Sequence, residues 1–191
     1  MEADKTLKLF KRTRAIQSGH FKLTSGLHSD TYVQCARILE KSVLTKKLCK
    51  ILALPWTAQK VDVVVGPAVG GIIIAYELSR ILKARAIYLE RVDGKLTLRR
   101  GFTIKPEETV LVTEDVVTTG GSVQEVIDVV KAQGGKLIGV ASLVNRNPEQ
   151  SLFGAEFNAL LKITPVVYQP NDCPLCKAGK PITQPGSRGL K

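Results

Sequence analysis

Uninterrupted apolar runs alternate along this chain with amphipathic segments whose apolar positions recur three and four residues apart. Such runs are typical of strands buried in a parallel sheet, whereas the second spacing predicts helices. The runs predict strands over residues 61–65, 84–89, 110–113, 136–144 and 159–164. The amphipathic segments predict helices over residues 42–59, 72–82 and 123–133. Because strands and helices alternate, we expect an α/β fold with a doubly wound, mostly parallel sheet flanked by helices.

The two ends of the chain depart from this alternation. Residues 5–18 have apolar positions at helical spacing and are followed by Gly19, which predicts a short amphipathic helix. Two short strands around a turn at 25–26 are expected next, so that residues 1–40 form an N-terminal helix and a small hood. Residues 165–191 are rich in proline, glycine and lysine, and we expect them to form a tail over the surface. All 191 residues together are predicted to form one domain.

A strand, a glycine turn and a helix start follow one another at residues 110–122, which read VLVTEDVVTTGGS. The strand ends at two adjacent acids, Glu114 and Asp115, and a small hydroxyl-rich turn follows. Ser122 and Glu125 have the spacing of a capping box, which predicts that the next helix begins here. Unpaired backbone N–H groups and the helix dipole favour an anion, and glycines allow it to approach closely. The segment therefore predicts a phosphate site.

Two carboxylates beside an anion site would repel a bare phosphate, so Glu114 and Asp115 need another partner. Sugar hydroxyls, a divalent cation, or both would serve, and a ribose 5-phosphate fits both halves of the motif. A second strand–loop–helix unit with glycines at residues 66–71 predicts another anion site. Two such sites on neighbouring strands could hold opposite ends of one polyphosphate.

Further candidate residues are cationic. The Asp93–Gly94 pair predicts a hairpin turn. Four cations surround this turn: Arg91, Lys95, Arg99 and Arg100. This segment is either a solvated hairpin or a basic flap that closes over a diphosphate. Arg146 follows the strand at 136–144, at the sheet edge where such folds bind ligands, and is either a surface charge or the bidentate partner of a carboxylate substrate.

Composition adds a strong positive charge, formally +11 at pH 7. Such a charge attracts anions of any kind, but only 5% of the residues are aromatic and the basic residues are scattered, so no nucleic-acid partner is expected. No run of about 18 apolar residues indicates a membrane span. Charges in the first residues are not typical of a signal peptide, so we expect a cytoplasmic protein.

The cysteines leave three readings open. Cys173 and Cys176 form a CxxC pair, whereas Cys35 and Cys49 stand alone. One CxxC is half of a zinc site, and a second pair at ligand spacing is missing from the sequence. A zinc site, a redox or disulfide role, and free structural thiols remain, with free thiols favoured in the cytosol.

Residues 110–122 resemble, over all thirteen positions, the phosphoribosyl diphosphate (PRPP) motif of type I phosphoribosyltransferases. The segment FKLTSGLHS and the later YVQCA resemble the hood of orotate phosphoribosyltransferases, and residues 66–71 and 145–146 match the same family. The resemblance implies the type I phosphoribosyltransferase fold and a glycosyltransferase that joins orotate to PRPP. The products would be orotidine 5′-phosphate and diphosphate, in de novo pyrimidine (UMP) biosynthesis, with Mg²⁺ as cofactor. It also implies a homodimer with shared active sites, in which the basic flap reaches the neighbouring subunit.

The resemblance further implies roles for individual residues. Those implied in catalysis are Glu114, Asp115, Arg91 and Lys95. PRPP would contact the same four together with Val116, Val117, Thr118, Thr119, Gly120, Gly121, Ser122, Ala68, Val69, Gly70 and Gly71. Orotate would contact Thr118, Arg146, Tyr32 and Val33. No protein metal ligand is implied, because PRPP would hold most of the Mg²⁺ coordination.

Three features depart from the family pattern. Thr24 and Gly70 stand where the family often has lysine, and the basic flap is short and has no histidine. A phosphoribosyltransferase for another base therefore remains an alternative, as does a regulatory protein of the same fold that binds PRPP without turnover.

Overall fold

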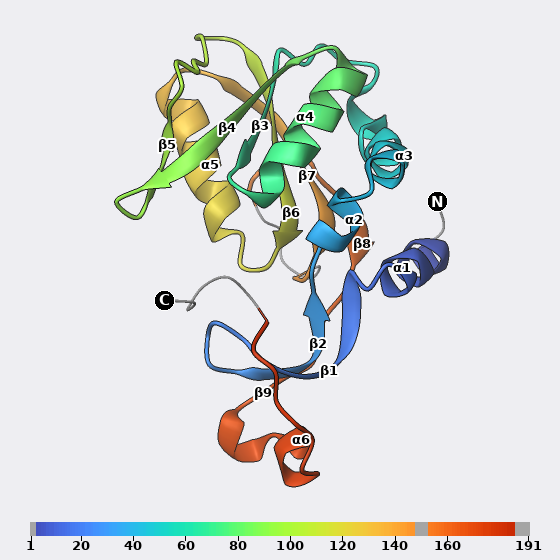
Figure 1. The fold of residues 1–191 in the computed structure, drawn as a ribbon. Coiled ribbons are helices and arrows are strands. Elements are labelled where there is room, and N and C mark those ends of the chain that lie inside the picture. The colour runs from blue at the N-terminus through green and yellow to red at the C-terminus, as the bar shows by residue number, and fades with distance from the viewer. Residues whose placement is uncertain (1–2, 148–152, 186–191) are drawn as a thin grey trace.

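A six-stranded sheet forms the centre of the protein in the computed structural model, which describes residues 3–147 and 153–185 (Figure 1). Its strands are β3 (Val63–Pro67), β4 (Arg85–Val92), β5 (Lys95–Leu98), β6 (Thr109–Val117), β7 (Lys136–Asn145) and β8 (Phe157–Lys162). They lie in the order β5-β4-β3-β6-β7-β8, and all pairs are parallel except β4 with β5. The predicted mostly parallel sheet is therefore confirmed.

Helices cover both faces of this sheet. They are α2 (Ala36–Leu39), α3 (Ser42–Leu52), the 3₁₀ turn η1 (Leu54–Trp56), α4 (Gly70–Leu82) and α5 (Gly121–Ala132). Successive side chains of a strand point to opposite faces, so Val64 packs in one core with Ile74 of α4, whereas Val63 packs in a second core with Val123 of α5. Figure 1 shows α4 and α5 on opposite sides of the strands, which confirms the doubly wound arrangement.

The N-terminal hood consists of α1 (Ala3–Arg12) and a small antiparallel sheet. Strands β1 (Ile16–Lys22) and β2 (His28–Val33) form the predicted hairpin. The predicted helix over residues 5–18 is too long, because Arg14 adopts a left-handed φ of 57° and the chain then enters β1. Ile16 is buried and pairs with Val33, so burial in the hairpin overrides the helical spacing of the N-terminal segment.

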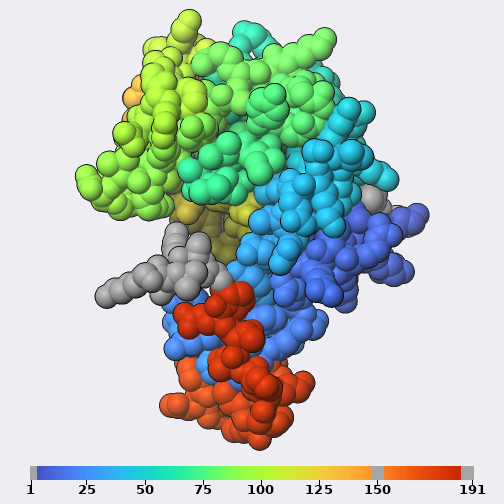
Figure 2. Space-filling model, in the orientation of Figure 1, coloured from blue at the N-terminus to red at the C-terminus, as the bar shows by residue number. Residues whose placement is uncertain are grey.

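The C-terminal segment is more ordered than the predicted tail. It contains β9 (Val167–Tyr168), the 3₁₀ turn η2 (Pro170–Asp172) and α6 (Pro174–Lys177). Strand β9 pairs with β2, and Thr183 bridges to Phe21 of β1. Figures 1 and 2 show these segments gathered on the hood, away from the large sheet. Residues 186–191, the last part of the predicted tail, lie outside the described residues.

The order of the strands reverses between β3 and β6. From β3 the chain continues outward to β4 and β5, whereas β6 is followed by β7 and β8 on the other side. Ligands of open α/β sheets bind at the carboxyl ends of the strands at such a switch point. Within the described residues, no helix is long and apolar enough to cross a membrane.

Candidate active site

The turn between β6 and α5 forms the centre of the candidate site. The helix begins at Gly121, and Gly120 precedes it with a left-handed φ of 83° that glycine adopts without strain. The predicted capping box is wrong, since no side chain caps this helix and Glu125 instead accepts hydrogen bonds from Arg91 and from the backbone N–H of Leu96. The first N–H groups of α5 therefore lack a side-chain cap and can receive an anion.

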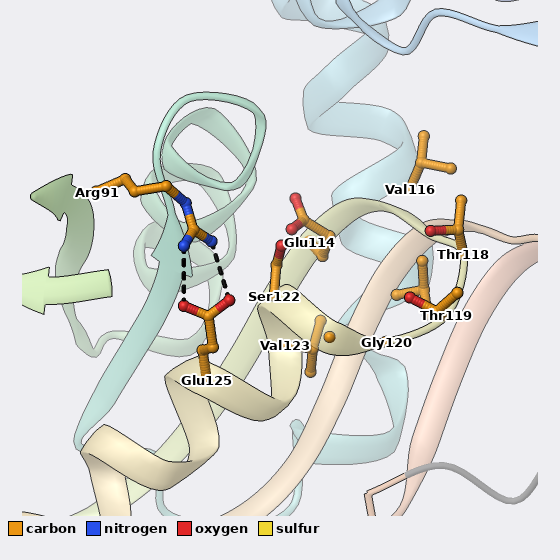
Figure 3. Close-up of a pocket in the computed structure, with 11 residues that line it drawn as sticks. Arg91, Glu114, Val116, Thr118, Thr119, Gly120, Ser122, Val123 and Glu125 are labelled. Atoms are coloured by element: carbon orange, nitrogen blue, oxygen red, sulfur yellow. Dashed lines mark hydrogen bonds and ion pairs between the residues drawn. The ribbon is translucent and has the colours of Figure 1, made fainter. Parts of the chain in front are cut away.

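A cavity of about 570 Å³ surrounds this turn (Figure 3). It is lined by Arg91, Glu114, Val116, Val117, Thr118, Thr119, Gly120, Gly121, Ser122, Val123 and Glu125. Apart from Arg91 these residues come from β6, the turn and the first five residues of α5. The hydroxyl-rich turn predicted from the sequence thus borders an open space with room for a sugar phosphate.

Glu114 and Asp115 lie side by side where β6 approaches its end. The backbone N–H of Asp115 donates to Glu114 Oε1 at 3.0 Å, and that of Val116 donates to Asp115 Oδ1 at 2.8 Å. Burial, and then the neighbouring charge of Asp115, raise the pKa of Glu114 to about 8. A cation or a pair of hydroxyl donors would stabilise the ionised form of Glu114. These are the two partners that the sequence predicted for the acids.

A second cavity, of about 760 Å³, lies beside the first and shares Arg91, Glu114 and Ser122 with it. The end of β3 and the start of α4, with the loop between them, line it with Pro67, Ala68, Val69 and Gly70, and Asp115 lines it from β6. The two predicted anion sites therefore meet across the pair of acids. Gly71, the remaining loop residue predicted to contact PRPP, is buried at the start of α4 against Pro67.

Position 70 requires a glycine because its backbone lies against the side chain of Asp115. A Cβ atom at position 70 would lie 2.5 Å from Asp115 Cγ, much closer than side chains approach one another. A lysine at this position, which the family pattern favours, would displace the acid in this structure. The packing of Asp115 against position 70 therefore explains why glycine replaces the lysine of the family pattern here.

Arg91 is the only one of the four flap cations that borders the cavities within the described residues. The predicted hairpin is confirmed, since β4 and β5 pair around Asp93 and Gly94, both with positive φ. Arg91 makes two hydrogen bonds of 3.0 Å to the Glu125 carboxylate, as the dashed lines in Figure 3 show. Arg100 pairs with Glu90 instead, and two further cations are exposed: Lys95 and Arg99.

A third cavity, of about 610 Å³, lies between the hood and the end of β7. Its lining includes Thr24, Ser25, Tyr32, Thr118, Thr119 and Arg146. Because Thr118 and Thr119 also line the first cavity, the two spaces adjoin at the turn. The switch point thus carries three adjoining cavities arranged around one loop.

Arg146 is the cation of the third cavity. Its Nε atom is buried and finds no hydrogen-bond partner among the described residues. Burial lowers the pKa of its guanidinium, and burial also raises the pKa of the Tyr32 hydroxyl that faces the same space. A buried guanidinium N–H without a partner is costly, so an anionic ligand in this cavity would be stabilised. Val33, by contrast, packs in the hydrophobic core, which leaves only its backbone as a possible contact.

Some lining residues had no individual signal in the sequence. Glu125 was expected to cap a helix, and its pairing with Arg91 depends on the distance between β4 and α5 in the folded chain. Pro165, Val167 and Pro185 line the third cavity because the C-terminal segment folds back over the hood. The composition of that segment predicted only an irregular tail.

Comparison with known proteins gives one consistent family. The model of the phosphoribosyl transferase domain matches residues 41–175. The orotate phosphoribosyltransferase of Carboxydothermus hydrogenoformans is 50% identical over 183 residues, which cover 95% of this chain and 96% of that protein. The orotate phosphoribosyltransferase of Thermotoga maritima is 48% identical over 188 residues, or 96% of this chain and 98% of that protein.

Solved structures show the same fold. Orotate phosphoribosyltransferase from Aeropyrum pernix has a TM-score of 0.68 at 23% identity, and the match covers 81% of this chain and 92% of that one. Adenine phosphoribosyltransferase from Rhodothermus marinus has a TM-score of 0.67 at 23% identity, over 84% of this chain and 99% of that one. Fold similarity alone therefore does not separate the bases, whereas the long and close sequence matches do. The chain belongs to the phosphoribosyl transferase family and, within it, to the orotate phosphoribosyltransferases.

Proposed function

We propose that this protein transfers the phosphoribosyl group of PRPP to orotate, giving orotidine 5′-phosphate and diphosphate in pyrimidine (UMP) biosynthesis. One observation carries the assignment of the substrates to the site. The uncapped start of α5, the Glu114–Asp115 pair and the partnerless Nε of Arg146 border three adjoining cavities. Together these cavities offer an anion site, a pair of acids for the ribose hydroxyls and a cation for the carboxylate of the base, which are the groups that the two substrates present.

Each cavity receives one part of the reactants. The turn at 118–122 binds the 5-phosphate through backbone N–H groups and hydroxyls. Glu114 and Asp115 accept hydrogen bonds from the ribose hydroxyls, and the loop at 68–71 binds the diphosphate with Arg91. Orotate lies in the third cavity with its carboxylate on Arg146, beside Thr118 and Tyr32.

The reaction breaks the bond from the anomeric carbon to the diphosphate oxygen and forms a bond from that carbon to a ring nitrogen of orotate, which releases its proton to solvent. By analogy with glycosyl transfer, positive charge develops on the ribose as negative charge builds on the diphosphate. Arg91 is placed to stabilise the departing diphosphate, and the two acids lie beside the developing positive charge. No nucleophilic side chain is required.

The pair of acids also fits Mg²⁺ as a cofactor. Two partly buried carboxylates with a raised pKa for Glu114 are hard oxygen donors that a divalent cation would stabilise. The oxygens of PRPP would supply most of the Mg²⁺ coordination, and the carboxylates of Glu114 and Asp115 would add negative charge beside the ion. Bound Mg²⁺ would neutralise charge on the diphosphate.

We also infer a homodimer with shared active sites. Lys95 and Arg99 are exposed on the β4–β5 hairpin and lie outside the cavities of their own chain, so they are available to a neighbouring subunit. Mixing a Lys95→Ala protein with an Asp115→Asn protein would restore activity if the flap acts across the dimer. Activity of the mixture equal to the sum of the activities of the two variants would contradict this arrangement.

The cytoplasmic location stays a prediction, which cell fractionation would check.

The base specificity is tested by supplying PRPP and Mg²⁺ with orotate, adenine, hypoxanthine or uracil, and measuring diphosphate release. We expect turnover with orotate, because only orotate among these bases carries a carboxylate for Arg146. Turnover of a purine alone would overturn the proposal. Salt-sensitive binding of RNA or DNA with no product would instead indicate a regulatory protein of this fold.

A further inference from the structure

Four potential metal ligands meet at the junction of the hood and the C-terminal segment. His20 lies in β1 and His28 begins β2, while Cys173 precedes α6 and Cys176 lies within it. The ligand atoms of all four side chains lie within 4.8 Å of one another. The pairing of β9 with β2 and the bridge from Thr183 to Phe21 bring the two ends of the chain together here. We call these four residues the hood–tail cluster.

The distances within the hood–tail cluster have the size that a tetrahedral zinc ion imposes. His20 Nε2 lies 3.1 Å from His28 Nδ1, 3.5 Å from Cys173 Sγ and 3.6 Å from Cys176 Sγ, and His28 Nδ1 lies 3.4 Å from Cys176 Sγ. Bonds of about 2.0–2.1 Å from Zn²⁺ to nitrogen and about 2.3 Å to sulfur place such ligand atoms about 3.3–3.8 Å apart. These four distances depart from this geometry by about 0.3 Å at most, and the two remaining pairs of ligand atoms, His28 with Cys173 and Cys173 with Cys176, lie within 4.8 Å.

Ordinary hydrogen bonds do not account for this convergence. His20 Nδ1 lies 2.9 Å from the carbonyl oxygen of Lys180, to which it can only donate, so in the neutral ring Nε2 carries a lone pair and no proton. Three groups surround that one nitrogen at 3.1–3.6 Å, although a single lone pair accepts one hydrogen bond well. A histidine that ligates a metal commonly donates its other N–H to a backbone carbonyl, as His20 can here.

We propose that His20, His28, Cys173 and Cys176 bind one Zn²⁺ in a closed structural site. Two thiolates and two neutral imidazoles carry a total charge of −2, which balances the charge of Zn²⁺. The resulting neutral complex suits a cluster in which His20, His28 and Cys173 are buried. The sequence showed only half of this site, because the second pair of ligands comes from the two strands of a hairpin some 150 residues away along the chain. All four cysteines are free of disulfides in the structure, as the favoured interpretation expected, and the proposal adds a metal ion to Cys173 and Cys176.

The site would fix the wall of the third cavity. The loop between His20 and His28 carries Thr24 and Ser25, and the segment before Cys173 carries Val167, all of which line that cavity. A metal that joins these two segments would hold them around the base. This consequence rests on the proposed function, whereas the metal site itself does not.

Elemental analysis of the purified full-length protein, expressed with zinc in the medium, tests the site directly. We expect one equivalent of zinc per chain in the unaltered protein and less than one-fifth of an equivalent in Cys176→Ser. After Co²⁺ replaces the zinc, the visible spectrum should show the absorption bands of four-coordinate Co²⁺ together with charge-transfer bands from the thiolates. Cys176 is exposed, so this substitution leaves the core intact. Cys49→Ala, which removes a buried thiol of α3 outside the cluster, should retain the full equivalent.

Any one of three results would overturn the proposed zinc site. The unaltered protein could contain no zinc and take up no Co²⁺, the freshly purified protein could contain a Cys173–Cys176 disulfide, or the Cys176→Ser protein could retain its zinc. Loss of zinc should also raise the orotate KM more than the PRPP KM. If zinc is present and the two KM values change equally, the metal site stands and only its link to the base cavity fails.

Discussion

Truncation of Arg146 is the change that separates recognition of the base from recognition of PRPP. Its Nε atom is buried without a partner among the described residues, so the cost of burying this cation is already present before a ligand binds. Removing one partner of a buried, hydrogen-bonded charge pair costs about 2–5 kcal/mol. That range corresponds to a loss of about 30- to 5000-fold in kcat/KM for orotate.

Initial rates of diphosphate release, measured while orotate and PRPP are varied in turn, check this prediction. Arg146→Ala should raise the KM for orotate by at least tenfold and change the KM for PRPP little. Arg146→Lys keeps the charge but loses the planar fork, so we expect an intermediate loss. Arg80→Ala, which truncates an exposed arginine of α4 paired with Glu77, is the control and should behave as the unaltered protein. Equal changes in both KM values would refute the assignment of the third cavity to orotate.

Three further changes test other parts of the site. Between pH about 4.5 and about 8 the free folded protein keeps a proton on Glu114 that the unfolded chain releases, so its melting temperature should fall as pH rises through this window, and Glu114→Gln should remove that part of the slope. A slope unchanged by this substitution would contradict the raised pKa. Gly70→Ala should displace Asp115 and lower kcat/KM for PRPP about 100-fold, whereas an unchanged value would mean that the loop moves aside freely. Arg91→Ala should lower kcat about 100-fold with an unchanged melting temperature, and a rate equal to that of the Arg80→Ala control would exclude Arg91 from the reaction.

The fold was largely predictable because each central element has a strong local signal. The buried runs at β3, β6 and β7 and the glycine loops after β3 and β6 identify the elements and their order. The errors lie where tertiary contacts override local preference. Burial of Ile16 against β2 converts the end of a predicted helix into a strand, and the contact of Glu125 with Arg91 replaces the predicted capping box.

The candidate site divides in the same way. The acids, the turn and Arg146 are contiguous with strand ends, so the sequence could place them at one edge of the sheet. The sequence does not show which flap cation borders the cavities, because this depends on the direction of the side chains along β4 and β5. The hood–tail cluster depends on pairing between segments about 150 residues apart. The CxxC pair indicates half of a zinc site, but nothing near His20 and His28 in the sequence identifies them as the other half.

The central claim is that one ribose phosphate lies between the acids and the glycine turn. A crystal structure of the protein with PRPP, Mg²⁺ and a non-reactive orotate analogue tests it most directly. We predict the 5-phosphate on the N–H groups of residues 118–122, the ribose hydroxyls on Glu114 and Asp115, and the analogue's carboxylate on Arg146. PRPP bound elsewhere, or bound here with its ribose turned away from both acids, would contradict the account.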